Sequence, residues 1–334
     1  MTISPYPRSS RWLLVAPALF LLVFLGIPTT VVVFREADFG SLERLLASSS
    51  FQQIAWFTLV QTVLSTLLTI IFALPVTYVL SRFTFTGKKL LLALVTAPFL
   101  LPTVVVGTAL FALLPTSLHY TATAIVIAHV LFNLAVVVRL VMPRWSQIDP
   151  ELIHAAHTLG ASTLRTFHTI TFPLIRPALG YASTAVALFC FTSFGAVRIL
   201  GGPAFSTLET EIYVRAVLLG DLQSAVAISI VQTIVLITAL YVLTRVSRTQ
   251  PNTQTINITA PKPSGFSQRA VVGLVSSITA IIVLAPLVAV AWKSSSGWSA
   301  VISGETGRSL YVSTSFAIVA ALLATTLGLS LIHI

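Results

Sequence analysis

Residues 121–142 read TATAIVIAHVLFNLAVVVRLVM, and Arg139 is the only charged residue among them. A helix needs about 20 mostly apolar residues to cross a hydrocarbon core of about 30 Å. Lipid offers no partner to backbone N–H and C=O groups, so a run of this length crosses a membrane as a helix. Residues 121–142 therefore predict an integral membrane protein.

Apolar runs of this kind recur along the chain, which has 334 residues, is 56% hydrophobic and 8% charged, and has a mean hydropathy of +0.97. A soluble domain carries about 25% charged residues. The other runs that we interpret as spans are 12–34, 52–81, 90–114, 178–200, 224–244, 270–292 and 310–331. The predicted fold class is all-α, a polytopic transmembrane helical bundle. Prolines are expected to bend these helices without ending them; they are Pro28, Pro75, Pro98, Pro102 and Pro286.

The charges predict the orientation of the chain. With the N-terminus in the cytoplasm, 13 of the 19 Lys and Arg residues fall on the inner side and 6 on the outer side, as the positive-inside rule requires. The net charge of +10 could also indicate nucleic acid. However, the basic residues stand singly between apolar runs and form no basic stripe, so we expect no nucleic-acid partner.

The polar segment 143–177 lies on the predicted inner side and is too long for a simple turn. Asp149 can cap a helix that starts at Pro150, and Gly160 can end that helix in the left-handed conformation. Ser162 can then cap a second short helix. The segment is therefore expected to form two short helices on the membrane surface.

Pro173 is expected to end the second of these helices. The first helix has a side made small by Ala155, Ala156 and Gly160, so another protein could approach it closely. An ordinary amphipathic surface helix would have the same pattern, and the residues alone favour neither reading.

Residues 246–268 are rich in Pro, Ser, Thr and Asn and are interpreted as a cytoplasmic linker. After the linker, the apolar pattern of the N-terminal helices restarts weakly, which indicates an internal duplication. The predicted organisation is a six-helix unit over 1–245, the linker, and the start of a second unit over 269–334. Two helices of that second unit are present, so we expect it to be incomplete in this chain.

The inner segment resembles the coupling loop of binding-protein-dependent ABC importer permeases, whose pattern is Glu-Ala-Ala, three variable residues, Gly, and an Ile/Val-x-Leu-Pro ending. The matching residues are Ala155, Ala156, Gly160, Ile170 and Pro173, with Asp149, Pro150, Glu151 and Phe167 also in agreement. His154 stands where the family has Glu, and Phe172 where it has Leu. The resemblance implies a loop over 145–177 that contacts the ATPase through Glu151, His154, Ala155, Ala156, Gly160, Ala161, Ser162 and Pro173.

Residues 128–134, 191–197 and 200–213 are similar to the ferric-iron and thiamine importer permeases, in which two permease halves are fused. The resemblance implies a multi-pass permease of the bacterial cytoplasmic membrane. A substrate, ferric iron or thiamine, would arrive on an extracytoplasmic binding protein. ATP would be bound by separate ABC ATPase subunits, with no cofactor in this chain.

The sequence contains no Gly-x-x-x-x-Gly-Lys-Ser/Thr motif and no arrangement of Ser, His and Asp typical of hydrolysis, so we expect no enzymatic activity and no catalytic residue. Cys190 is the only cysteine, which excludes an intrachain disulfide and a cysteine zinc site. His154 and His157 are one helical turn apart, but such a pair on a polar loop is usually solvated, and we expect no metal site.

Four polar residues within or beside the spans are candidates for the transport pathway, namely His129, Asn133, Thr192 and Ser193. Hydrogen bonds between helices would explain the same residues, and the two readings stay open. An ion-coupled secondary carrier is the alternative function. Such a carrier usually needs a charged residue near a span centre, and none of the spans shows one convincingly.

Overall fold

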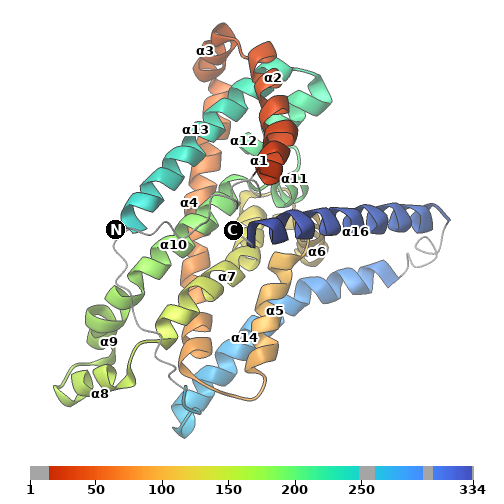
Figure 1. Cartoon of the computed structure of the whole chain (residues 1–334). Coiled ribbons are helices and arrows are strands. Elements are labelled where there is room, and N and C mark those ends of the chain that lie inside the picture. The colour runs from red at the N-terminus through yellow and green to blue at the C-terminus, as the bar shows by residue number, and fades with distance from the viewer. Residues whose placement is uncertain (1–14, 248–259, 296–303, 333–334) are drawn as a thin grey trace. The chain divides into compact units, whose positions relative to one another are not determined.

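The structure is a computed structural model that describes residues 15–247, 260–295 and 304–332. Throughout these ranges, every regular element is a helix (Figure 1). The long apolar runs explain this outcome, because a helix satisfies its backbone hydrogen bonds internally. The all-α prediction is confirmed.

The chain divides into two compact units, one formed by Met1–Phe39 with Lys293–Ile334 and the other by Gly40–Trp292. The division predicted from the sequence, with a linker over 246–268, stays a prediction. In the first unit the helical elements described are α1 (Val15–Leu21), η2 (Leu22–Gly26), α2 (Ile27–Glu36) and α16 (Gly304–Ile332).

The second unit carries the candidate site. Its helices up to the inner loop are α3 (Phe39–Ala47), α4 (Ser49–Arg82), α5 (Lys88–Leu100), α6 (Thr103–Leu113), η3 (Thr116–Leu118) and α7 (Ala122–Ser146). Those that follow are α8 (Pro150–Thr158), α9 (Thr163–Thr166), η4 (Phe167–Thr171), α10 (Phe172–Phe191), α11 (Gly195–Leu200), α12 (Leu208–Tyr213), η5 (Val214–Leu219), α13 (Leu222–Ser247) and α14 (Gly265–Ser294).

Seven of the described helices are long and apolar enough to cross a membrane, and α5 with α6 makes an eighth span if the pair is counted as one. The number therefore agrees with the eight predicted runs. The pair α5 and α6 is bent by 105°. Pro102, expected only to bend a helix, in fact separates two: Leu101 before it is extended (φ −76°, ψ 147°), as steric contact with a following proline favours.

The inner segment also differs from its prediction. The helix that starts at Thr163 continues to Phe191, so Pro173 does not end it and the span does not run over 178–200. A π-helical segment covers Phe167–Thr171. It is followed directly by α10, and Pro173 lies in the first turn of α10. Pro173 is accommodated where the π-helical hydrogen-bond pattern changes to the α-helical one.

The core of this unit lies where α4, α7 and α10 pack side by side (Figure 1). The face that α4 buries carries small polar side chains at helical spacing, namely Thr58, Thr62, Ser65, Thr66 and Thr69. Thr66 and Thr69 donate their hydroxyl hydrogens to the backbone four residues earlier, each at 2.7 Å. These small side chains therefore add no unpaired hydroxyl to the interface and let the helices approach closely.

Asp221 caps α13 outside the spans, because its carboxylate Oδ1 accepts from the backbone N–H of Ser224 at 3.1 Å. Arg215 donates to its Oδ2 at 3.2 Å and to Glu211 Oε1 at 2.8 Å. Hydrogen bonds from Ser224, followed by the charge of Arg215, hold the pKa of Asp221 below its ordinary value.

A lowered folded-state pKa gives stability that is present above the unfolded value of about 3.9 and is lost as the pH falls through the folded value. Asp221→Ala should therefore destabilise the start of α13 by about 1 kcal/mol at pH 7, and by less at pH 3. Asp221→Asn keeps a capping oxygen but loses the charge, so at pH 7 its stability should fall between those of the Ala variant and the wild type. Hydrogen exchange of the Ser224 amide measures both, and an Ala variant with unchanged exchange at pH 7 would contradict the capping role.

Candidate functional site

The first helix of the inner loop begins as its sequence predicts. Asp149 accepts from the Glu151 backbone N–H at 2.9 Å, and Pro150 occupies the first turn of α8. Glu151 places a negative charge near the positive end of the helix. These local contacts fix where α8 starts.

The end of α8 is a Schellman motif centred on Gly160. Gly160 has φ +82° and donates its N–H to the His157 carbonyl at 2.9 Å. Ala161 donates to the Ala156 carbonyl at 3.0 Å, the six-to-one bond of the motif. Ser162 then accepts from the Arg165 N–H at 3.3 Å and caps α9. The predicted left-handed glycine and the predicted second cap are both confirmed.

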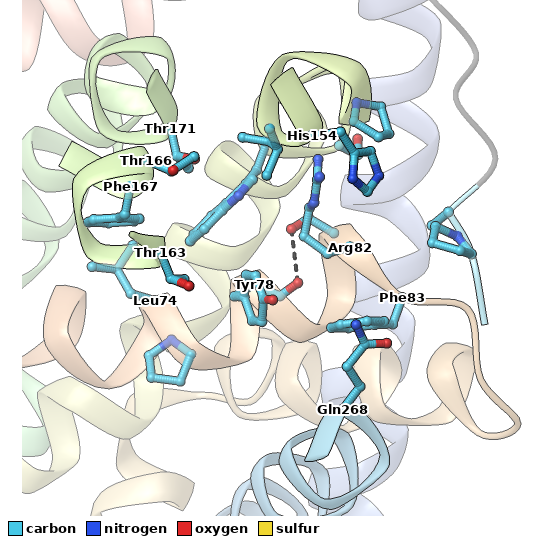
Figure 2. Close-up of a pocket in the computed structure, with 18 of the residues that line it drawn as sticks. Leu74, Tyr78, Arg82, Phe83, His154, Thr163, Thr166, Phe167, Thr171 and Gln268 are labelled. Carbon is cyan, nitrogen blue, oxygen red and sulfur yellow. Dashed lines mark hydrogen bonds between the residues drawn. The ribbon is translucent and has the colours of Figure 1, made fainter. Parts of the chain in front are cut away.

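The loop is anchored to the helix bundle at its start (Figure 2). Arg82, at the end of α4, donates to the Ile148 carbonyl at 2.9 Å. Trp145, 4% exposed, places its ring 5.7 Å from Tyr78 and 6.3 Å from Phe167, centroid to centroid. Figure 2 shows Tyr78, Phe167 and Arg82 around one cavity. The loop therefore rests on α4 through an aromatic cluster and one charge-assisted hydrogen bond.

The loop also carries three exposed apolar side chains that lie outside its motif. Leu159 is 87% exposed, Leu164 68% and Leu152 50%. A Cβ built on Gly160 would meet nothing within 4 Å, so the space above this turn is open. Exposed apolar side chains on a polar loop are candidates for burial by a partner. Their positions on either side of Gly160-Ala161-Ser162 were the signal available in the sequence.

The loop lines a cavity of about 900 Å³ between α8, the end of α4 and residues 260–268 (Figure 2). His154 and His157 lie on its wall with Arg82 and Gln268. His154, which occupies the family's Glu position, is exposed there, and His157 bonds through Nδ1 with the Ala161 carbonyl at 3.0 Å. Within the described residues, no group of three or more His, Cys, Asp or Glu side chains comes together.

The four candidate pathway residues come from two segments far apart in the sequence, and the structure brings all of them to one cavity. His129 and Asn133 on α7, and Thr192 and Ser193 after α10, line a space of about 250 Å³. The other lining residues are Phe99, Thr103, Val106, Ala128, Phe132, Phe189, Phe194 and Ala196. Their proximity is established, and a role in transport stays a prediction.

Solved structures with a similar fold include a bacterial ABC transporter that imports alginate. The match has a TM-score of 0.59 and 18% sequence identity, and it covers 72% of this chain and 96% of that chain. The same fold appears in a complex of that transporter with a periplasmic protein carrying an alginate pentasaccharide. At this identity the similarity establishes the fold alone.

Curated relatives include the sulfate transport system permease protein CysW of Synechocystis sp., 29% identical over 216 residues, which are 60% of this chain and 78% of CysW. The thiamine transport system permease protein ThiP of Brucella abortus is 29% identical over 275 residues, 76% of this chain and 48% of ThiP. A molybdate/tungstate permease protein, WtpB of Pyrococcus abyssi, is 27% identical over 190 residues, 57% of this chain and 77% of WtpB. The chain thus spans about half the length of the thiamine permease.

The family model of binding-protein-dependent transport system inner membrane components matches residues 65–249. This range contains α7, the inner loop and both groups of candidate residues. The spans, the relatives and the family model agree, and the chain belongs to the family of binding-protein-dependent transport system inner membrane components, the permeases of ABC transporters.

Proposed function

We propose that this permease couples ATP hydrolysis to import through the loop 145–177, which docks on an ABC ATPase subunit in the cytoplasm. The observation that carries the proposal is the exposed Leu159 beside the open turn at Gly160. An exposed leucine beside an open space on the surface is suited to burial by a partner protein. Glu151, His154, Ala155, Ala156, Ala161, Ser162 and Pro173 are the further residues assigned to this loop.

The anchoring of the loop explains how a movement of the ATPase would reach the membrane helices. Arg82 ties the loop to the end of α4, and the chain continues without a break from Thr163 into α10. A push on the loop therefore moves α4 and α10, two of the helices that form the core. Such a rigid-body change needs only that the ATPase fit the loop differently in its open and closed states.

The remaining parts of the proposal follow from the sequence. The chain has no phosphate-binding motif, so ATP and its hydrolysis belong to the partner subunits. The excess of positive charge on one side supports a cytoplasmic location for the N-terminus and α8. On the opposite side, an extracytoplasmic binding protein delivers the substrate, thiamine or ferric iron.

An ion-coupled secondary carrier is the alternative function. Ion coupling usually relies on an ionisable carboxylate or base inside the spans. The buried polar side chains of the described residues are Ser, Thr, Asn, Gln and His. Loss of uptake on addition of an uncoupler, with uptake unaffected by removal of the ATPase, would favour the carrier.

A thiol placed at Leu159 tests the docking surface directly. Cys190 is fully buried, so the unaltered chain should react slowly with a maleimide. Leu159→Cys should react fast in the isolated chain and about 10-fold more slowly once the cognate ATPase subunit is bound, because binding buries this side chain. Leu218→Cys, 55% exposed and outside the loop, is the matched control. Equal labelling of both sites with and without the ATPase would contradict the proposal.

A further inference from the structure

The cavity of about 900 Å³ beside the inner loop shares no lining residue with the inner cavity of about 250 Å³, which the candidate pathway residues line. Its walls come from the end of α4, from α8 and η4, and from residues 260–268 (Figure 2). The Thr84 backbone N–H donates to the Pro261 carbonyl at 2.9 Å, and one buried cluster joins α4 to α14. These contacts hold residues 260–268 against the end of α4.

The part of α4 that lines the cavity runs from inside the span to its end. The lining residues of α4 recur at helical spacing and form one face of the helix, namely Ile71, Leu74, Pro75, Tyr78, Ser81 and Arg82. Ile71 and Arg82 are 11 positions apart, which is about 16 Å along a helix that rises about 1.5 Å per residue. This length is about half of a hydrocarbon core of about 30 Å. The cavity therefore extends from the membrane surface to the depth of an acyl chain.

The end of the cavity at the membrane surface offers N–H donors that a ligand can reach. Lys262 is exposed and has no carboxylate partner among the described residues, and Arg82 is half-buried. Arg82 Nη1 donates to the Ile148 carbonyl at 2.9 Å, which leaves the other N–H groups of the guanidinium available. Gln268 Oε1 accepts from the Ser264 N–H at 2.8 Å, so the amide hydrogens of Gln268 are available as well.

No negative side chain offsets these charges. Asp and Glu are absent from the described residues that line the cavity. The acidic residues nearest in the sequence are Asp149, which caps α8, and Glu151, and neither lines it. A guanidinium binds phosphate oxygens through two N–H groups, and a lysine binds them as a point charge. The surface end of the cavity therefore suits a phosphate group.

The deeper part of the cavity is apolar. Ile71 is 58% exposed, Leu74 is half-buried, and Trp145 and Phe167 form the wall across from α4. The volume of about 900 Å³ lies near the top of the range of about 300–1,000 Å³ that is typical of ligand pockets. It is enough for a phosphate headgroup and part of an acyl chain. A free phosphate ion would leave the apolar part without a partner.

We propose that this cavity binds an anionic phospholipid, with its phosphate at Arg82 and Lys262 and an acyl chain along α4 toward Ile71. Basic pockets between membrane helices bind anionic headgroups in other membrane proteins. The proposal goes beyond the proposed function, because it requires neither an ATPase nor a transported solute. The lipid would lie between the inner loop and α4 and, together with the hydrogen bond from Arg82 to Ile148, would support the loop.

Competition for radiolabelled phosphatidylglycerol tests the proposal on the full chain, purified in dodecyl maltoside and freed of native lipid. The labelled lipid should bind saturably. Phosphatidylcholine with the same acyl chains should displace it about 10-fold less well than unlabelled phosphatidylglycerol, because its choline group offsets the charge of the phosphate. Glycerol 3-phosphate in large excess should not displace it, because this anion has no acyl chain.

Two variants test the two ends of the cavity. Lys262→Gln should weaken phosphatidylglycerol binding about 5-fold, and Lys89→Gln is the matched control, because Lys89 is also exposed but does not line the cavity. Ile71→Trp fills the apolar part and should weaken binding about 10-fold. Phe72→Trp is its control, because Phe72 is 56% exposed at the same depth but lies outside the cavity. All four side chains are exposed, so the variants should fold.

The proposal is overturned if phosphatidylglycerol does not bind saturably, or if phosphatidylcholine displaces it equally well. Displacement by glycerol 3-phosphate would indicate a site for free phosphate and would also overturn it. Equal affinities of Lys262→Gln and Lys89→Gln would show that the lipid binds elsewhere on the chain. The assay contains no ATPase, so its failure leaves the docking experiment at Leu159 unaffected.

Discussion

Gly160→Asn should reduce ATP-driven uptake about 10- to 100-fold while leaving the chain folded and inserted. Asparagine tolerates the left-handed conformation, so the turn at φ +82° and its Schellman bonds should survive. The new side chain would instead fill the open space above the turn. Overfilling a close-packed contact costs about 1–3 kcal/mol, and each 1.4 kcal/mol weakens binding tenfold. The measurement is substrate uptake, together with affinity for the ATPase, in proteoliposomes.

Two further variants distinguish an effect on the docking contact from an effect on the backbone conformation of the turn. Gly220→Asn is the matched control, because Gly220 is also left-handed (φ +68°), lies outside the loop, and has open space within 4 Å of where a Cβ would stand. It should transport normally. Gly160→Ala adds less volume but forces an unfavourable conformation, costing about 1–2 kcal/mol. If Gly160→Ala lost uptake activity and Gly160→Asn did not, uptake would depend on the backbone conformation of the turn and not on a close contact with the ATPase.

Gly195→Ala should lower the free energy of unfolding by about 1–3 kcal/mol. A Cβ at this position would lie 2.4 Å from Thr103 Oγ1 and 3.0 Å from the Val104 backbone nitrogen. The hydroxyl of Thr103 can rotate away, but the backbone of α6 can move only if α6 and α11 separate.

Thermal unfolding followed with a thiol-reactive dye measures this effect, since Cys190 is fully buried and becomes reactive only when the chain opens. Gly180→Ala is the matched control: Gly180 lies within α10, and a Cβ added to it would meet nothing within 4 Å. Alanine is favoured over glycine inside a helix by roughly 0.5–1 kcal/mol, so this variant should be as stable as the wild type or slightly more stable. Equal melting temperatures for the two variants would contradict the close approach at Gly195.

Much of the fold follows from local signals in the chain. Most spans are runs of apolar residues long enough to cross a membrane, and for this reason the number of predicted runs agrees with the described helices. The exceptions are the run 178–200, whose helix lies at Thr163–Phe191, and the run 90–114, which forms the bent pair α5 and α6. The conformation of the inner loop also depends on local contacts. Asp149, Gly160 and Ser162 act on backbone groups at most four residues away, so their roles could be read without knowledge of the tertiary contacts.

The prolines show where local signals end. Pro75 and Pro98 lie inside continuous helices, whereas Pro102 separates two helices at 105°. The amino acid is the same in each case, and the difference comes from what packs around it. α6 packs against α11 at Gly195, a contact between residues about 90 positions apart that no local pattern reveals. No local pattern indicated the π-helical segment Phe167–Thr171, through which the helix Thr163–Phe191 continues past Pro173.

The inner loop and the inner cavity also differ in how far the sequence predicts them. The shape of the loop could be predicted from its sequence because it depends on local contacts, but the exposure of Leu159 depends on which side of α8 faces the bundle. The inner cavity needed the fold, since polarity alone could not distinguish a packing residue from a lining one. Asn133 donates to the His129 carbonyl within α7 and to Cys190 Sγ on α10, so the second of these hydrogen bonds exists only because α7 packs beside α10.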